Sequence, residues 1–347
     1  PWGVAVSKDG SRMLVAHSGT HELSVVDLPG LLKKLRAHPD HQMPSFLGGA
    51  VESSYDSTLP VVTDMAFLQG VRERITVSGD GPRGICIAGG KAWVANYFSD
   101  SVSIFDLSGE RVKETRVIHL GSDEPADEIR QGEAVFHDAS VCFQGWQSCA
   151  TCHPDGRVDG LNWDLLNDGL GNPKNTKSLL LAHQTPPSMS LGIRSDAETA
   201  VRAGFRHILF STVDEKTASS VDAYLKSLKP SSFVSPFARE SVERGRALFH
   251  SESTQCASCH NGPFYTDLKS YDVGTRGPYD REDSFDNPTL IELWRTAPYL
   301  HDGSAATIHE VLTTFNSNDE HGVTSHLSKQ DLADLEAYLL ALPLERE

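Results

Sequence analysis

The chain has 347 residues and a formal net charge of −16, with 31 Lys and Arg against 47 Asp and Glu. This acidity excludes the basic patches of nucleic-acid-binding proteins, and no apolar run approaches the ~20 residues that span a bilayer. No charged and apolar leader stands at the start of the chain, so we expect any signal peptide to have been removed.

Residues 1–120 show the pattern of short β-strands. Strand-like alternation runs over residues 3–6, 13–16 and 23–28, and Asp9-Gly10 is a hairpin signal. A similar pattern recurs about 80 residues later, over residues 82–107. The repeat resembles blades of a YVTN-type β-propeller, so the predicted fold class is all-β, an incomplete propeller. Residues 30–70 are expected to hold a short helix and either a degenerate blade or an insertion.

Two or three blades do not close a propeller, which needs about four to eight. We therefore expect one of two arrangements. Either the chain is part of a longer protein that supplies the missing propeller portion, or these sheets pack against a partner subunit or against the rest of this chain. We favour the first alternative.

Four of the six cysteines fall in two C-x-x-C-H strings, at residues 149–153 and 256–260. This spacing is the attachment pattern of c-type haem, in which two thiols bond to the porphyrin and the adjacent His binds the iron. A thioredoxin-like redox pair would not need the His, and the two pairs are too far apart in sequence for a typical four-cysteine zinc site. The predicted attachment residues of two haem c groups are Cys149, Cys152, His153, Cys256, Cys259 and His260.

Covalent haem c is attached outside the bacterial cytoplasm, so we expect a periplasmic or otherwise exported protein. Cys86 and Cys142 lie outside the two strings. They are interpreted as two buried or free thiols, or as a disulfide, which an oxidising compartment permits.

The haem strings lie inside an internal duplication. Residues 132–137 precede the first string as residues 245–250 precede the second, and both predict a short amphipathic helix. Residues 185–187 likewise match residues 296–298. The copies end on matching helical segments with apolar residues three and four apart, at residues 222–228 and 336–342.

We therefore expect two copies of one small α-helical cytochrome c domain, over residues 121–230 and 231–347. A linker rich in proline and serine is predicted at residues 230–236.

The second axial ligand of each iron decides whether a haem carries electrons or binds a substrate. His207 and His321 occupy equivalent positions in the two copies, at the same distance before a Tyr of the last helix. The sequence therefore predicts His153 with His207 at the first iron, and His260 with His321 at the second. The rival ligands are Met189 at the first iron and His326 at the second.

The segment Arg-Thr-Ala-Pro-Tyr-Leu-His-Asp-Gly-Ser, at residues 295–304, resembles the bacterial dihaem cytochrome c peroxidase and MauG superfamily. The resemblance covers about residues 121–347, and with the N-terminal strands the chain resembles proteins that join YVTN repeats to a dihaem module. It implies Ca²⁺ between the haem domains, bound by the Asn175 side chain and the carbonyls of Thr296 and Pro298. Such oxygen ligands suit a hard cation.

Departures from the family pattern bear on the activity. In the enzymes one haem has an open or water-bound distal face, and an acidic residue beside it transfers protons during O–O bond cleavage. Residues 197–214 lack the family's acidic segment and offer His207 instead, while Phe315 stands near the position of a Met or Tyr ligand. We therefore predict electron transfer through two bis-His haems, with the acidic surface steering a basic electron carrier.

The alternative function is that of a cytochrome c peroxidase or MauG-like oxidoreductase that uses H₂O₂. This alternative requires one distal position to be open, and three carboxylates near the first haem are candidates for its acid. They are Asp196, Glu198 and Asp214, each of which also fits a solvated helix position.

Overall fold

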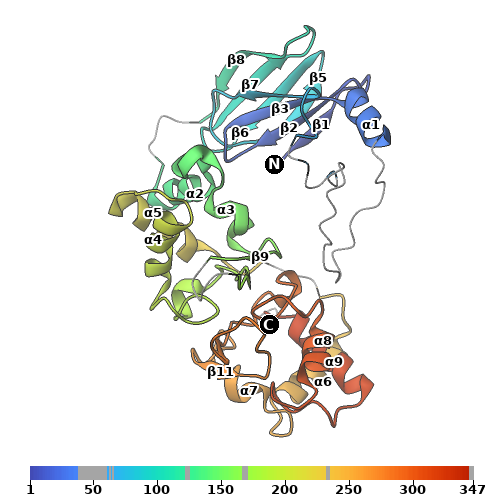
Figure 1. The fold of residues 1–347 in the computed structure, drawn as a ribbon, viewed down its shortest axis with the longest axis vertical. Coiled ribbons are helices and arrows are strands. Elements are labelled where there is room, and N and C mark those ends of the chain that lie inside the picture. The colour runs from blue at the N-terminus through green and yellow to red at the C-terminus, as the bar shows by residue number, and fades with distance from the viewer. Residues whose placement is uncertain are drawn as a thin grey trace. The chain divides into compact units, whose positions relative to one another are not determined.

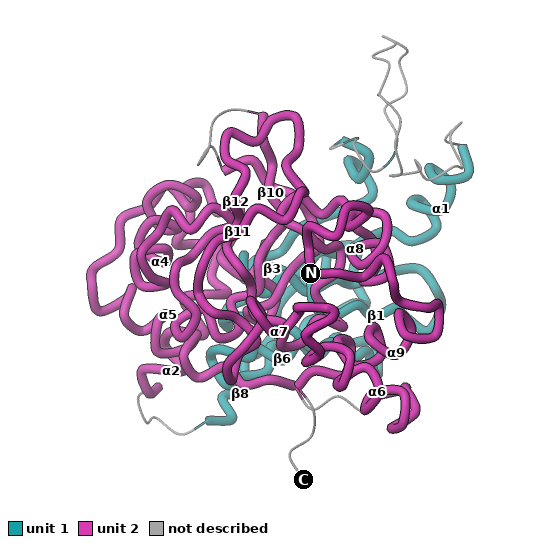
Figure 2. The backbone as a smooth tube through the Cα atoms, turned by 90° about the horizontal axis from the view of Figure 1, so that it is seen from below, with its two compact units in different colours: residues 1–125 teal, residues 126–347 magenta. Residues whose placement is uncertain are grey.

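The computed structural model describes residues 1–37, 61, 64, 66–121, 126–165, 171–231 and 235–343. The chain forms two compact units, Pro1–Pro125 and Ala126–Glu347 (Figure 2). The predicted β segment, residues 1–120, falls within the first unit. The two predicted haem domains lie together in the second unit.

The first unit consists of two four-stranded antiparallel sheets, each with its strands in sequence order (Figure 1). The helix α1 (Leu28–Ala37) follows the third strand. The strands of the first sheet are β1 (Val4–Val6), β2 (Arg12–His17), β3 (Glu22–Asp27) and β4 (Arg72–Thr76). Those of the second are β5 (Pro82–Ala88), β6 (Lys91–Asn96), β7 (Ser101–Asp106) and β8 (Lys113–His119).

One hydrophobic core joins the two sheets. Leu14 and Leu23 of the first sheet and Val94 and Phe105 of the second are fully buried in it. The alternation of buried and exposed residues, clearest in β6, places every second side chain in this core. The repeat of about 80 residues is therefore a repeat of whole sheets. The incomplete propeller remains a prediction, and the degenerate blade or insertion expected at residues 30–70 falls largely on residues outside the described ranges.

In the second unit, two equivalent helix pairs form the cores of the duplicated halves (Figure 1). In the first half α2 (Glu128–His137) packs on α5 (Glu215–Ser227), and in the second α6 (Arg239–Phe249) packs on α9 (Lys329–Leu340). The ring centroids of Phe136 and Tyr224 lie 5.2 Å apart, and those of Phe249 and Tyr338 lie 5.3 Å apart. The predicted duplication and its helices are thus present.

Glycine sets the spacing in both helix pairs. A Cβ atom on Gly132 would come within 1.8 Å of the Ser220 carbonyl oxygen, and one on Gly245 within 1.9 Å of the Asp334 carbonyl oxygen. Any larger residue would force the two backbones apart, which explains why glycine recurs at this point of the repeat.

Short elements connect these helices. The helices are α3 (Cys149–Cys152), α4 (Ala197–His207), α7 (Cys256–Cys259) and α8 (Ile308–Leu312). The short strands are β9 (Asn162–Trp163), β10 (Lys174–Asn175), β11 (Ser270–Asp272) and β12 (Ser284–Asp286). The same unit contains the 3₁₀ turns η4 (Ala182–Gln184), η5 (Leu293–Arg295) and η6 (Thr314–Asn316). No helix within the described ranges is long and apolar enough to cross a membrane.

Ion pairs cross between the two halves of the second unit. Arg157, Lys174 and Lys177 of the first half pair with acidic residues of the second. Their partners are Glu292 at 2.8 Å, Asp280 at 2.8 Å and Asp286, and each of these carboxylate side chains is at most 5% exposed. Because a buried charge without its partner is costly, these pairs fix how the halves fit together.

Candidate haem sites

The two C-x-x-C strings form the single-turn helices α3 and α7, and all four of their cysteines are free thiols. Burial raises the pKa of Cys149 to about 12 and that of Cys152 to about 11. A reactive redox pair needs a lowered thiol pKa, so this environment argues against thioredoxin-like chemistry. Cys86 and Cys142 are also free, so the disulfide alternative is absent from the structure.

The histidine that ends each string is oriented by a backbone carbonyl. His153 Nδ1 lies 3.2 Å from the Arg157 carbonyl oxygen, and His260 Nδ1 lies 3.0 Å from that of Tyr265. Burial lowers the pKa of both imidazoles. A neutral imidazole that donates from Nδ1 presents Nε2 as a metal ligand, so both residues fit the role of a proximal haem ligand.

His321 faces His260 in the second half. Their ring centroids lie 6.2 Å apart, with an angle of 37° between the ring planes. Burial, with a smaller effect of His260, lowers the pKa of His321 to about 4, so its imidazole is neutral at pH 7. Two imidazoles that bind one metal from opposite sides, at about 2 Å each, have centroids about 6 Å apart. The pair therefore fits a single iron between the rings.

A dedicated loop holds His321 in this position. The backbone N–H of His321 donates to Asn316 Oδ1 at 2.7 Å, and Asn316 Nδ2 donates to the Gly322 carbonyl at 3.0 Å and to Thr324 Oγ1 at 2.8 Å. Asn316 and Thr324 are both buried. The rival His326 is exposed just beyond this loop, and its ring makes no contact with His260 in the described part of the chain.

The first half does not repeat this arrangement. His207 is the last residue of α4 and is exposed, and within the described ranges its ring does not contact His153. The reason is helix length, since α4 has 11 residues whereas the equivalent α8 has 5. His207 therefore remains on a helix where His321 stands on a loop. The rival Met189 is half-buried in a turn closed by the Ser188–Arg194 bridge.

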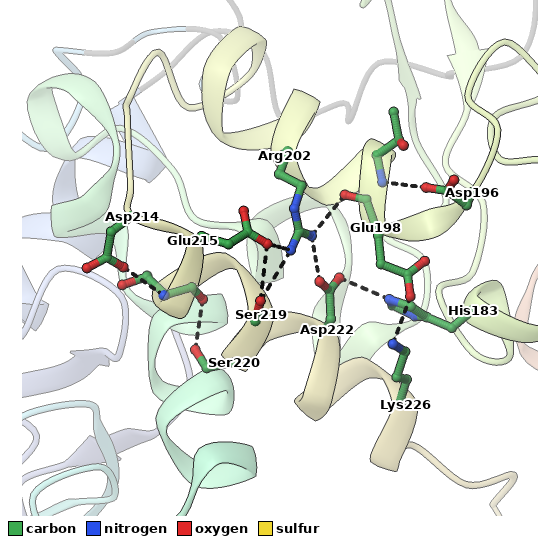
Figure 3. A network of polar contacts seen from close by, with 12 residues as sticks. His183, Asp196, Glu198, Arg202, Asp214, Glu215, Ser219, Ser220, Asp222 and Lys226 are labelled. Atoms are coloured by element: carbon green, nitrogen blue, oxygen red, sulfur yellow. Dashed lines mark hydrogen bonds and ion pairs between the residues drawn. The ribbon is translucent and has the colours of Figure 1, made fainter.

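The three candidate distal acids form helix caps or an ion pair in the first half (Figure 3). Asp196 and Asp214 cap α4 and α5, accepting from the backbone N–H groups of Thr199 and Thr217. Hydrogen bonds from Thr199 and Ser195 lower the pKa of Asp196 to about 2. Glu198 pairs with Lys226 at 2.7 Å. These contacts fit the alternative interpretation as solvated helix positions, because each carboxylate forms a helix cap or an ion pair.

A polar network around Asp222 was not predicted (Figure 3). Its carboxylate accepts from Arg202 at 2.5 Å and contacts His183 Nε2 at 3.0 Å. Burial alone would raise the pKa of Asp222, but these two partners hold it below the ordinary value. Through this contact His183 joins η4 to α5. The second copy has no His at the equivalent position, so the duplication gave no indication of this contact.

The predicted calcium ligands are partly brought together. Asn175 is buried, and its Nδ2 donates to the Pro298 carbonyl oxygen at 3.3 Å. The Thr296 hydroxyl donates to the Leu293 carbonyl at 3.2 Å. Among the described residues no cluster of three His, Cys, Asp or Glu side chains could hold a metal ion. The calcium site is a set of amide and carbonyl oxygens and remains a prediction.

Comparison with known proteins places this arrangement in a family. No protein-family model matches the chain. It is 30% identical over 277 residues to hydrazine synthase subunit gamma of Kuenenia stuttgartiensis, over 62% of this chain and 77% of that protein. It is 25% identical to the methylamine utilization protein MauG of Methylophilus methylotrophus, over 59% of this chain and 77% of that protein. The chain belongs to the MauG and dihaem cytochrome c peroxidase superfamily.

A solved structure supports the same membership. Hydrazine synthase of Kuenenia stuttgartiensis, determined under xenon pressure, matches with a TM-score of 0.58 and 28% identity, covering 64% of this chain and 89% of that chain. The resemblance seen in the sequence is therefore confirmed for the dihaem module. MauG and dihaem peroxidase relatives imply two haem c cofactors.

Proposed function

We propose that the chain is a dihaem c-type oxidoreductase whose second haem transfers electrons and whose first haem is the reactive one. The observation that carries this proposal is the facing pair of His260 and His321. A haem held by these imidazoles would have a protein ligand on both sides and no position left for a substrate. Two imidazole ligands also favour a lower reduction potential than a His–Met pair, which suits electron transfer.

The first site supports a different role. His153 is oriented as a ligand, but no second imidazole faces it within the described ranges. This asymmetry favours the peroxidase-like or MauG-like alternative over electron transfer through two bis-His haems. When bound, the haem supplies the redox chemistry, and the protein supplies the proximal ligand, its orientation and the surrounding charges. H₂O₂ is the substrate that we propose for this site.

The attachment residues follow from the two strings. We propose thioether bonds from Cys149 and Cys152 to the first haem, and from Cys256 and Cys259 to the second. Because haem c is attached outside the bacterial cytoplasm, we also propose a periplasmic or otherwise exported location. Ca²⁺ bound by Asn175, Thr296 and Pro298 remains part of the proposal, with the Asn175–Pro298 contact as its support.

The charge of the chain bears on its partner. A net charge of −16 would attract a basic electron carrier, with an association rate that falls as salt is added. We propose that the β unit docks such a partner or packs against further propeller blades.

A single-haem variant tests the assignment. In Cys149→Ser/Cys152→Ser we expect one covalent haem, measured by mass and by haem absorbance, where the wild type carries two. This remaining haem should be low-spin in the oxidised state and should not bind CO when reduced. A high-spin signal or CO binding in this variant would contradict the assignment of His260 and His321.

A matched variant examines the other site. Cys256→Ser/Cys259→Ser should also retain one haem, and this first haem should bind CO when reduced. If it is as closed to CO as the second haem, electron transfer through two six-coordinate haems is the better account.

A further inference from the structure

Arg157 connects the first haem site to the second half of the unit. Its backbone carbonyl lies 3.2 Å from His153 Nδ1. Its guanidinium pairs with Glu292, with Nε to Oε2 at 2.8 Å and Nη2 to Oε1 at 3.1 Å. The side chains of Arg157 and Glu292 are 6% and 1% exposed. One residue thus orients the imidazole of the first half through its backbone and contacts the second half through its side chain.

The surroundings leave this pair little freedom. Arg157 also donates to the carbonyls of Asp155 at 3.0 Å and Lys229 at 2.9 Å. Glu292 also accepts the backbone N–H of Ser231 at 2.5 Å. The planar guanidinium is therefore held from several directions, and bidentate pairing with a carboxylate fixes its orientation. Moving the Arg157 carbonyl would require the breaking of a buried ion pair.

Within the described ranges, the residue that orients the second imidazole makes no such ion pair with the other half. The carbonyl that contacts His260 Nδ1 belongs to Tyr265, whose hydroxyl lies 3.2 Å from that of Tyr338. Tyr338 lies on α9 of the same half and is fully buried. The second imidazole is therefore supported within its own half, whereas the first is supported across the boundary between the halves.

We propose that Glu292 is a positioning residue for the first haem, which it reaches through Arg157 and the Nδ1 hydrogen bond of His153. The inference rests on the proposed haem at His153. The orientation of the His153 imidazole then depends on a residue of the second half. The carbonyl that orients His260 belongs to Tyr265, a residue of the same half as His260.

The direction of the effect follows from the hydrogen bond. A carbonyl that accepts the Nδ1 proton makes the imidazole a stronger electron donor to iron and so stabilises the ferric state. Without Glu292 the Arg157 loop is released and this hydrogen bond weakens. The reduction potential of the first haem should then rise, and that of the second haem should not change.

The test is a spectroscopic redox titration of the full chain carrying both haems. The two midpoints are assigned with the single-haem variants described above. We expect Glu292→Gln to raise the midpoint of the first haem and to change its EPR g values, with those of the second haem unchanged. As a matched control, Tyr338→Phe should affect only the second haem.

A second variant keeps the inference testable if Glu292→Gln does not fold. Arg157→Lys retains the charge and the backbone carbonyl but loses the bidentate contact, so it should shift the first midpoint in the same direction. Unchanged spectra and potentials in a folded variant, or equal shifts at both haems, would overturn the inference. A wild-type protein without two covalent haems would instead refute the proposed function, and haem content separates these two results.

Discussion

The imidazole rings of His260 and His321 face each other with their centroids 6.2 Å apart, although 61 positions separate the two residues in the chain. Both are half-buried and have lowered pKa values, because desolvation disfavours the imidazolium form. A neutral pair at this separation is suited to hold one metal ion between them, and the C-x-x-C string beside His260 makes haem the natural occupant.

Removal of His321 should open the second haem. In His321→Ala we expect part of the low-spin EPR signal to be replaced by a high-spin signal, together with new CO binding after reduction. His326→Ala is the matched control, because His326 is exposed and should leave both spectra unchanged. The reverse outcome would show that His326 is the ligand.

His207 should not be needed at the first haem. It is exposed at the end of α4 and its ring does not contact His153 in the described structure. We therefore expect His207→Ala to keep the EPR spectrum and the CO stoichiometry of the wild type. A new high-spin signal in this variant would restore the bis-His model that the duplication predicts.

The close helix crossing predicts opposite effects of two Gly→Ala substitutions. Gly245→Ala places a Cβ atom 1.9 Å from the Asp334 carbonyl oxygen, and should lower the free energy of unfolding by about 1–3 kcal/mol or more. At Gly204 in α4 a Cβ atom would meet nothing within 4 Å, so Gly204→Ala should raise it by about 0.5–1 kcal/mol. Chemical denaturation measures both, and equal effects would contradict the packing argument.

Asp334 of α9 pairs with Arg244 of α6, and this ion pair makes the stability of the protein depend on pH. Its carboxylate accepts from Arg244 at 2.6 and 2.8 Å, and this contact, with those of Ser241 and Gln330, lowers its pKa to about 2. A carboxylate with a lowered folded-state pKa stabilises the protein above its unfolded pKa of about 4, and this contribution is lost as the pH falls towards 2.

Asp334→Asn should therefore destabilise the protein by about 1–2 kcal/mol at pH 7, a modest value because Arg244 is 55% exposed. The difference from the wild type should shrink between about pH 4 and pH 2. Urea denaturation at several pH values measures it. A difference that is constant with pH would assign the effect to packing instead of charge.

The duplication made much of the second unit predictable. Phe136 and Phe249 precede equivalent haem strings, and their contacts with Tyr224 and Tyr338 follow from matched apolar patterns. The same logic predicted His207 as a ligand, but the structure places this residue, exposed, at the end of a longer helix, because an equivalent position in sequence does not fix where a helix ends.

The sequence held no comparable pattern from which contacts between distant residues could be predicted. Arg157 and Glu292 are 135 positions apart, and neither belongs to a motif or has a like residue at the equivalent position in the other copy. Their pairing depends on how the two halves pack, which local patterns do not specify. In the β unit the periodicity predicted the sheets, but their common core appears only in the folded structure.

The most direct test of the account is the number of haems in the wild-type protein that bind CO. The oxidised protein is examined by low-temperature EPR, and the reduced protein is titrated with CO against its measured haem content. We predict one low-spin signal with two imidazole ligands and the binding of one CO per two haems, at the haem held by Cys149 and Cys152. Binding of no CO, or of two CO per chain, would contradict the division of roles between the two haems.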